Sequence, residues 1–457
     1  MSSINFLLAI HNHQPVGNFD SVIEDAYQAS YLPLLETLSR HPEIPYAIHH
    51  SGCLLDWLEA HRPEYLEALT ERVRAGQVEP LTGGYYEPIL PAIPEAHRVG
   101  QIRKLSAWIR DRFGVAPTGL WLTERVWEPS LAASLADAGV GYTMVDDTHF
   151  LAAGAPPEQL WSPYLTEDQG KPVTVFPISK ALRYLIPFRP PEETIAFLRK
   201  LADTCPGGAA LLGDDGEKFG VWPNTHRLVY EEGWLEQFLT LLEAERDWLH
   251  VMTPSAYLAQ QPPASKLYLP TASYDEMMEW ALPATVQSDF HALREEMGDA
   301  AGARFVRGGF WRNFFSRYPE SDHLNKRVIQ VGQALEAANG NLPQATRDRL
   351  WAAECNCAYW HGVFGGLYLP HLRTALYENL LAAEAAVDAL EHPEKDWAEV
   401  AERDFDCDGE AELFLRNPEL TLVVSPREGG TLQEWSVKPL GVALGNDHTT
   451  HNMSNVG

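Results

Sequence analysis

The chain has little cysteine. Its 457 residues include only five, at positions without a repeating pattern: Cys53, Cys205, Cys355, Cys357 and Cys407. So small a set does not form the disulfide framework of a secreted scaffold, and the odd count favours reduced thiols, so we expect a cytoplasmic protein. Cys355 and Cys357 form a C-x-C, but no second pair stands at zinc-site spacing. We therefore expect packing thiols at these two positions.

Positive charge is also scarce. Lys and Arg total 35 against 63 Asp and Glu, which gives a formal net charge of −28. Nucleic-acid binding needs basic residues in excess, and an anionic membrane surface would repel this chain. The charge thus argues against both partners. A neutral glycan is compatible with it, although acidity serves solubility equally well.

Long hydrophobic runs are absent as well. No stretch approaches the length of a membrane span, and the first apolar run, residues 4–10, lacks the basic flank and cleavage site of a signal peptide. We interpret that run as a buried strand. Hydrophobic residues at 45% and charged residues at 21% are typical of a soluble globular protein, and the length suggests two or three domains.

Short apolar runs alternate with amphipathic segments up to about residue 255. The runs are residues 4–10, 46–49, 78–81, 119–123, 142–145, 173–177, 209–212 and 249–252. Helical patterns between them include 65–75 and 232–245. This order predicts parallel strands joined by right-handed crossovers, and seven or eight such units favour a closed or nearly closed (β/α) barrel. A doubly wound sheet is the alternative, but the Gly-rich phosphate turn after its first strand is missing.

The pattern changes after the barrel. Residues 305–390 are largely helical in pattern, and from residue 411 apolar positions alternate in short runs separated by Pro and Gly. A polar tail without pattern covers residues 446–457. Three or four strands are few for a sandwich, so we expect a partial, truncated β-sandwich. The domains are then a catalytic barrel at 1–300, a helical domain at 301–395 and the sandwich at 396–457.

Two acidic residues carry the main functional signal. Glu124 and Asp215 each follow an apolar run, where a strand gives way to a loop. In a barrel of parallel strands, that end carries the chemistry. Two facing carboxyl groups are the minimum for cleaving a glycosidic bond, about 5–5.5 Å apart for retention and about 6.5–9.5 Å for inversion. The pair predicts a sugar-cleaving enzyme; the alternative is that both acids form ion pairs at strand ends.

The two carboxyls suit different roles. We assign Glu124 as the nucleophile, because Arg125 and nearby histidines would favour its charged form. Asp215 suits the acid/base role, with a pKa raised by burial and by the charge of Glu124. Asp214 points to the other side of the same strand, so only one of the two aspartates can face the substrate.

Substrate contacts are expected from two histidines, one further acid and several aromatic side chains: His11, His13, Glu79, Tyr86, Trp121, Trp222 and Trp280. The apolar faces of sugar rings lie well on indole, although each of these aromatic residues could equally be core. His11 and His13 would also fit a metal pair, but no third ligand stands at a recognisable spacing. We therefore expect no metal and no cofactor.

Five short segments together resemble glycoside hydrolase family 57, a resemblance that covers about residues 4–445. They are residues 11–15, 83–88, 121–129, 214–220 and 268–280. The last one, with 312–315 and 359–366, resembles the branch of 4-α-glucanotransferases and α-amylases. The resemblance implies an incomplete (β/α)7 TIM-like barrel, a helical bundle domain and a C-terminal β-sandwich. It places the nucleophile on Glu124 and the acid/base on Asp215, without a catalytic metal.

These inferences predict a retaining 4-α-glucanotransferase that acts on α-1,4-glucans or maltooligosaccharides through a covalent glucosyl-enzyme intermediate. An α-amylase that hydrolyses the same substrates is the first alternative. A metal-dependent polysaccharide deacetylase and a non-catalytic glycan-binding relative are the others. The sequence is compatible with a homodimer but does not fix the subunit count.

Overall fold

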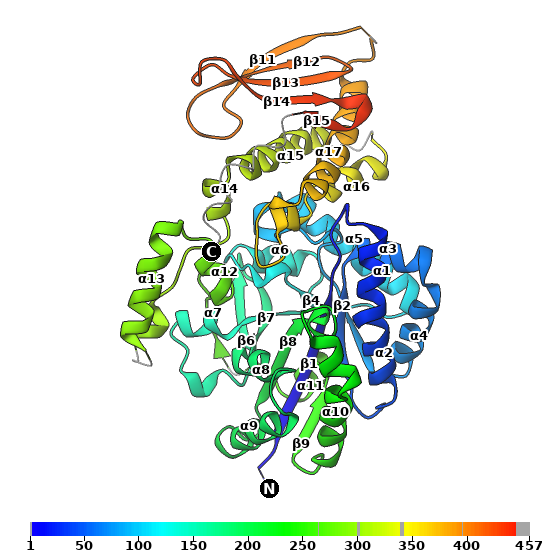
Figure 1. Cartoon of the computed structure of the whole chain (residues 1–457), viewed down its shortest axis with the longest axis vertical. Helices are drawn as coiled ribbons and strands as arrows, with labels where there is room; N and C mark the ends of the chain where they lie inside the picture. Colours follow the sequence, from blue (N-terminus) through cyan, green and yellow to red (C-terminus); the bar gives the residue numbers. More distant parts are fainter. Residues whose placement is uncertain (1, 264, 299–301, 339–341, 395, 445–457) are drawn as a thin grey trace.

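Figure 1 shows the computed structural model, which describes residues 2–263, 265–298, 302–338, 342–394 and 396–444. A barrel forms one end of the molecule, helices lie next to it, and an antiparallel sheet forms the other end. The parallel strands of the barrel are β1 (Ile4–Asn12), β2 (Tyr46–His50), β3 (Val78–Leu81), β4 (Gly119–Trp121), β5 (Tyr142–Asp146), β7 (Lys171–Ile178) and β8 (Ala209–Asp215).

These seven strands form a ring. Going round it, β3 pairs with β2, β2 with β1, β1 with β8, β8 with β7, β7 with β5 and β5 with β4. An isolated parallel bridge between Thr82 and Leu120 joins β4 back to β3. The ring is weakest at this bridge and between β7 and β8, which share one register pair, Ile178 with Leu211. The predicted α/β barrel of seven units is confirmed.

The apolar runs of the sequence correspond to these strands, and they are apolar because the strands are buried. All nine residues of β1 are buried, as a central parallel strand requires. The run at 249–252 is β9 (Leu249–Met252), which pairs with the first half of β1. The sequence pattern does not predict β6 (Tyr164–Asp168), which forms an antiparallel hairpin with β7, or the two-residue β10 (Ser265–Lys266).

Helices cover the outside of the barrel. They are α1 (Asp20–Ala26), α2 (Leu32–Ser39), α3 (Gly52–His61), α4 (Pro63–Arg74), α5 (Glu95–Phe113), α6 (Leu131–Asp137), α7 (Asp147–Ala152), α8 (Lys180–Leu185), α9 (Pro191–Thr204), α10 (Trp234–Ala244) and α11 (Pro254–Gln260). The two helical patterns predicted at 65–75 and 232–245 are confirmed as α4 and α10. In each, the apolar residues at helical spacing are the buried ones.

A second set of helices lies over the carboxyl end of the barrel. It consists of α12 (Asp275–Trp280), α13 (Ala284–Met297), α14 (Asn313–Arg317), α15 (Pro319–Ala337), α16 (Gln344–Ala352) and α17 (Pro370–Glu391). Their apolar core includes Ile89 and Val126, which belong to barrel loops, together with Tyr274. Because barrel loops and helices share one core, the helical region is held against the mouth of the barrel.

The C-terminal part is one antiparallel sheet of five strands in sequence order: β11 (Glu399–Arg403), β12 (Glu412–Arg416), β13 (Leu420–Ser425), β14 (Thr431–Val437) and β15 (Val442–Leu444). A buried ion cluster joins it to the helices, since Arg327 of α15 binds both Glu384 of α17 and Glu434 of β14. The tail predicted at 446–457 lies outside the described residues. Within the described part of the chain, no helix has the length and apolar character needed to cross a membrane.

Candidate active site

The polar residues singled out by the sequence gather where the barrel strands end. β8 ends with Asp215, whose Cα is in register with that of His11 on the neighbouring β1. Glu124 lies in a short 3₁₀ turn, Thr123–Arg125, which directly follows β4. Both carboxyls are therefore at the carboxyl end of the barrel, where catalytic residues of such barrels lie.

Glu124 and Arg125 have an unusual backbone. Both are in the left-handed region, with φ of 51° and 50°, a conformation that costs a non-Gly residue about 1–3 kcal/mol and gathers at functional sites. The hydroxyl of Tyr274 donates a hydrogen bond to Oε2 of Glu124 at 2.8 Å. The guanidinium of Arg125 lies over the ring of Tyr274, 4.4 Å from its centroid. The turn thus holds Glu124 beside a hydroxyl donor and a cation.

The two adjacent aspartates of β8 face opposite sides, as strand alternation predicts. Oδ1 of Asp215 lies 4.0 Å from Nη1 of Arg125, and a third of the side chain (33%) is exposed. Asp214 is buried and forms ion pairs with Lys218 and Arg183. Of the two, Asp215 is therefore the one that shares Arg125 with Glu124.

Gly216 allows the strand end to approach β1. A Cβ at this position would lie 1.8 Å from Oδ1 of Asn12, closer than any side chain tolerates. Asn12 is fully buried and is hydrogen-bonded to His50 at 3.0 Å. A glycine directly after Asp215 is therefore required for the register that places Asp215 beside His11.

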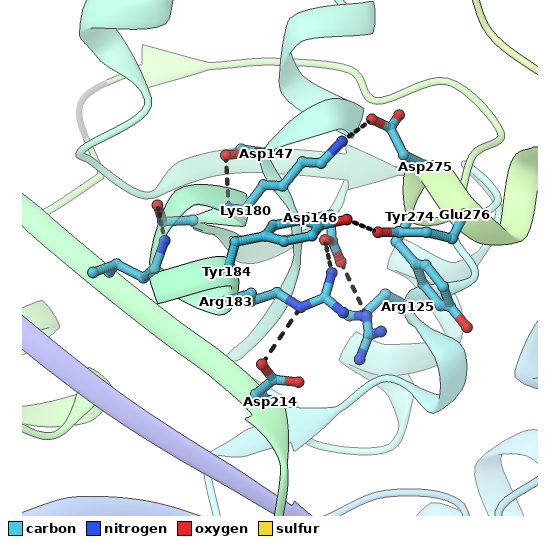
Figure 2. Close-up of polar contacts among 12 residues, drawn as sticks. Arg125, Asp146, Asp147, Lys180, Arg183, Tyr184, Asp214, Tyr274, Asp275 and Glu276 are labelled. Carbon is cyan, nitrogen blue, oxygen red and sulfur yellow. Dashed lines mark hydrogen bonds and ion pairs between the residues drawn. The ribbon is translucent and has the colours of Figure 1, made fainter. Parts of the chain in front are cut away.

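Behind the site lies a buried chain of charges, shown in Figure 2. Oδ1 of Asp146, the last residue of β5, accepts a hydrogen bond from Nη1 of Arg183 at 2.9 Å. Its other oxygen, Oδ2, lies 3.0 Å from Nε of Arg125. Nε of Arg183 lies 3.7 Å from Asp214. Asp146 therefore holds two guanidinium groups of like charge next to each other.

Burial dominates the proton affinities in the site. Burial raises the pKa of Glu124 and that of Asp215, and in both cases Arg125 opposes the rise. The expectation that nearby histidines favour ionised Glu124 is wrong. Burial lowers the pKa of His11 well below its ordinary value and that of His13 to about 3, so both are neutral near pH 7. Of the charged groups that act on the two carboxyls, Arg125 has the largest effect on both pKa values.

His11 and Trp121 form one wall of the site. Their rings stack with centroids 4.7 Å apart, and Nδ1 of His11 lies 2.9 Å from Nδ1 of His49, so that one imidazole donates to the other. Trp121 is 1% exposed and belongs to the apolar interior of the barrel. Its ring therefore supports His11 from below.

Glu79 and Tyr86 lie away from the two carboxyls. Glu79 is two register positions deeper in the barrel than His11, where its carboxylate accepts hydrogen bonds from the Tyr142 hydroxyl at 2.6 Å and from the Ser255 N–H at 3.1 Å. The Tyr86 hydroxyl accepts a hydrogen bond from Lys104 at 3.0 Å. Both residues are thus engaged with protein partners in this structure.

Trp222 and Trp280 lie in partly exposed aromatic groups. Trp222 follows β8 and stacks with Phe188 at a centroid distance of 6.2 Å, with Phe364 of the helical region 6.1 Å away on a tilted plane. Trp280 stacks with Trp360 at 6.4 Å. The first group combines a barrel segment with the helical region, whereas both tryptophans of the second belong to the helical region. Both groups offer flat apolar surface to a sugar chain.

Two acids next to His13, the buried Glu87 and the partly buried Glu217, were missed. Oε2 of Glu87 lies 3.6 Å from Nδ1 of His13, and Oε1 of Glu217 accepts a hydrogen bond from the His13 backbone N–H at 2.9 Å. Burial raises the pKa of Glu217 to about 8 and that of Glu87 well above its ordinary value. Both lie inside segments 83–88 and 214–220, which resemble the family and could have pointed to them. Nothing in the local sequence indicates their contact with His13.

Three groups of side chains among the described residues could hold a metal ion: His11, His49 and Glu87; His13, Cys355 and Cys357; and Asp404, Asp406 and Glu412. The first two adjoin the site. In the sequence no third ligand stands at a recognisable spacing from His11 and His13, whereas the fold brings two thiols to His13. The expected absence of a metal stays a prediction.

Comparison with known proteins agrees with this architecture. A family model described as Glycosyl hydrolase family 57 matches residues 7–270. Models for the middle and C-terminal domains of alpha-amylase/4-alpha-glucanotransferase match residues 309–387 and 404–447. The three matches follow the barrel, the helices and the terminal sheet in order.

Individual relatives are similar over nearly the whole chain. Alpha-amylase 1 of Dictyoglomus thermophilum is 47% identical over 449 residues, which are 97% of this chain and 65% of that protein. The 4-alpha-glucanotransferase of Thermococcus kodakarensis is 45% identical over 96% of this chain and 65% of its own length. The crystal structure of 4-alpha-glucanotransferase from Thermococcus litoralis superposes with a TM-score of 0.91 at 44% identity, covering 98% of this chain and 68% of that one. This chain spans about two thirds of the length of the curated relatives it matches.

Proposed function

This chain belongs to glycosyl hydrolase family 57, and from that premise we propose that it cleaves α-1,4-glucans with retention and passes the glucosyl group to a second glucan. The activity is that of a 4-α-glucanotransferase. Relatives that carry this name and relatives named α-amylase match the chain almost equally well. Hydrolysis of the same substrates is therefore the second candidate.

The observation that carries the proposal is the sharing of one guanidinium by two carboxyls. Arg125 is adjacent to Glu124 in the turn and lies 4.0 Å from Asp215. The charge of Asp215 raises the pKa of Glu124, and the charges of both acids raise the pKa of Tyr274, so the two carboxyls lie near each other. Two acids around one opening are what glycoside cleavage requires.

The surroundings favour a different protonation state for each acid. Glu124 receives a hydrogen bond from Tyr274 and the nearby charge of Arg125, both of which favour its ionised form. Burial and the charge of Asp214 oppose ionisation of Asp215. We therefore assign Glu124 as the nucleophile and Asp215 as the group that still holds a proton.

The reaction then has two steps. Glu124 attacks the anomeric carbon and the bond to the leaving oxygen breaks, while Asp215 gives its proton to that oxygen. In the second step Asp215 takes a proton from the acceptor hydroxyl, which displaces Glu124 from the same carbon. The acceptor is a sugar hydroxyl in transfer and water in hydrolysis, and the balance depends on how well bound sugar excludes water.

Binding of an extended glucan is supported by the aromatic groups at the mouth of the site. Trp222 and Trp280 are partly exposed and stand with aromatic residues of the helical region, Phe364 and Trp360. His11 and His13 are neutral and can exchange hydrogen bonds with sugar hydroxyls without adding charge. We include these four residues in the sugar-binding surface.

The cysteines support a reducing compartment. All five are free thiols, although Cys355 and Cys357 lie close together. We propose the cytoplasm as the site of action, where such thiols stay reduced.

Incubation of the purified chain with maltoheptaose tests the proposal. Transfer gives both longer and shorter oligosaccharides, whereas hydrolysis gives shorter ones only. The glucanotransferase assignment fails if no product exceeds seven glucose units at any time. The enzyme assignment itself fails if maltoheptaose binds to the protein but is not converted.

A further inference from the structure

Three metal-binding side chains from two distant parts of the chain meet beside the active site. His13 directly follows β1, and Cys355 and Cys357 lie between α16 and α17. Nε2 of His13 lies 3.1 Å from Sγ of Cys357. One ligand atom from each of the three residues lies within 4.8 Å of the others. These three side chains could thus hold a single ion between them.

The other nitrogen of His13 faces a carboxyl group. Nδ1 of His13 has no hydrogen-bond partner among the described residues, and Oε2 of the buried Glu87 lies 3.6 Å from it. Histidines that bind metals almost always direct their second nitrogen to a carboxylate or carbonyl, which fixes the tautomer and strengthens the metal-binding nitrogen. In this arrangement the ring is protonated at Nδ1, which faces Glu87, and the unprotonated Nε2 can bind an ion on the side of the thiols.

The two thiols are already connected. The thiol of Cys357 is hydrogen-bonded to Cys355, and this contact, together with the backbone N–H groups of Val16 and Cys357, lowers the pKa of Cys355. Thiolate is the form of cysteine that binds metals, so both thiols lose their protons when an ion binds. Cys355 is fully buried and Cys357 is partly exposed, so an ion would enter from the side of Cys357.

We propose that His13, Cys355 and Cys357 form a site for a thiophilic divalent cation such as Zn²⁺ or Cd²⁺, and that its occupation inhibits the enzyme. One imidazole and two thiolates are a soft ligand set, and three protein ligands leave a fourth tetrahedral position open. Calcium and magnesium prefer oxygen ligands and are excluded on that ground. Both thiol protons are released on binding, so the affinity rises with pH.

Inhibition follows from the place of His13. Its backbone N–H binds Glu217, its ring faces Glu87, and Cys357 is close enough to Glu124 for their charges to interact. An ion would fix the His13 ring against the helical region and fill space next to the proposed nucleophile. This part of the inference rests on the proposed function, whereas binding of the cation does not.

Titration of the metal-free protein with Cd²⁺ tests the site directly, because thiolate–cadmium charge transfer gives an ultraviolet absorption band whether or not the chain is active. We expect a band that saturates at one Cd²⁺ per chain. Cys355→Ser and Cys357→Ser should each weaken the affinity at least tenfold, and Glu87→Gln about 10–100-fold. Cys205→Ser is the control, since its thiol lies elsewhere and contacts the carbonyl of Glu158.

A missing band in the wild-type protein, or a band unchanged in both Cys355→Ser and Cys357→Ser, would overturn the site. Two serine variants are used so that a folding defect at the buried Cys355 leaves the test intact. Conversion of maltoheptaose should stop in Cd²⁺ and return after EDTA in the wild type and in Cys205→Ser. Full activity in saturating Cd²⁺ would overturn the inhibitory role, whereas lack of activity without metal would count against the proposed function alone.

Discussion

Nε of Arg125 lies 3.0 Å from Oδ2 of Asp146, and both side chains are almost fully buried. The ion pair anchors one end of the guanidinium while its Nη1 reaches toward Asp215. Removing one partner of a buried pair leaves an uncompensated charge, so neither residue can be exchanged without consequence. Asp146 therefore acts on the two proposed catalytic carboxyls through the position of Arg125.

Asp146→Asn should lower kcat/KM about 100-fold, because a guanidinium released from its anchor moves away from the reacting groups. With Arg125 displaced, the pKa values of Glu124 and Asp215 both rise, so the pH–rate profile should move to higher pH. Asp147→Asn is the matched control, since Asp147 contacts the backbone N–H of Lys180 and not Arg125. Unchanged pH limbs in Asp146→Asn would show that Arg125 is held by other contacts.

Substitution of the two proposed catalytic acids should abolish turnover while the fold remains. We expect Glu124→Gln to lose at least about 10³-fold in kcat and Asp215→Asn about 10²–10⁴-fold. Thermal unfolding of both variants should stay close to that of the wild type.

Asp214→Asn provides the contrast to Asp215→Asn. Because Asp214 is buried between Lys218 and Arg183, its loss should cost stability, of the order of 3 kcal/mol, and much less turnover. Measurements of kcat on maltoheptaose and of unfolding by denaturant separate the two effects. An equal loss of turnover in both variants would mean that Asp215 is not the acid.

Tyr274→Phe should shift the acid limb of the kcat/KM profile upward by about one pH unit. The Tyr274 hydroxyl donates to Glu124, and a hydrogen bond to a charged group is worth about 1.5–3 kcal/mol. Without it, Glu124 ionises less readily, and a higher pH is needed to produce the nucleophile. Tyr184→Phe is the control, because that hydroxyl binds Glu276 instead. An identical acid limb in both variants would remove Tyr274 from this role.

Glu434→Gln should destabilise the contact between the helices and the terminal sheet in a pH-dependent way. Arg327 and His323 lower the pKa of Glu434, against burial, from 4.5 to about 2. A carboxyl whose pKa is lower in the folded state stabilises the fold at pH values above its pKa in the unfolded state. That contribution is lost as the pH falls from about 4.5 through about 2. The contribution near pH 7 is about 3 kcal/mol.

Denaturant unfolding at several pH values measures this contribution. The difference between wild type and Glu434→Gln should be largest near pH 7 and should shrink below about pH 4.5. Glu428→Gln, an exposed acid on the loop before β14, should show neither effect. A constant difference at all pH values would mean that the variant disturbs packing and not charge.

The strands and the placement of the two acids could be predicted because they depend on local pattern. A buried parallel strand must be continuously apolar, and the residue that follows it must lie at the carboxyl end of the barrel. The antiparallel β6 could not be predicted because it is short and only half-buried, and its Leu165 is exposed. It is a strand because it pairs with β7, and the local sequence does not show this pairing.

The partners of the two acids could not be predicted because they come from far along the chain. Tyr274 is 150 positions from Glu124, and Cys357 is 344 positions from His13. The charge of the histidines was misjudged for a related reason. Histidine is protonated near neutral pH only where water or an acid stabilises the cation, and the burial that removes the water from His11 and His13 is a property of the whole fold.

The left-handed turn at Glu124 and Arg125 has a consequence for engineering. Residues 124 and 125 reduce the stability of the fold, so changes that relax this backbone would raise heat tolerance and misalign the nucleophile at the same time. A search for hardier variants should therefore leave this pair untouched and start with apolar side chains that face water far from it, such as Val400 and Leu440.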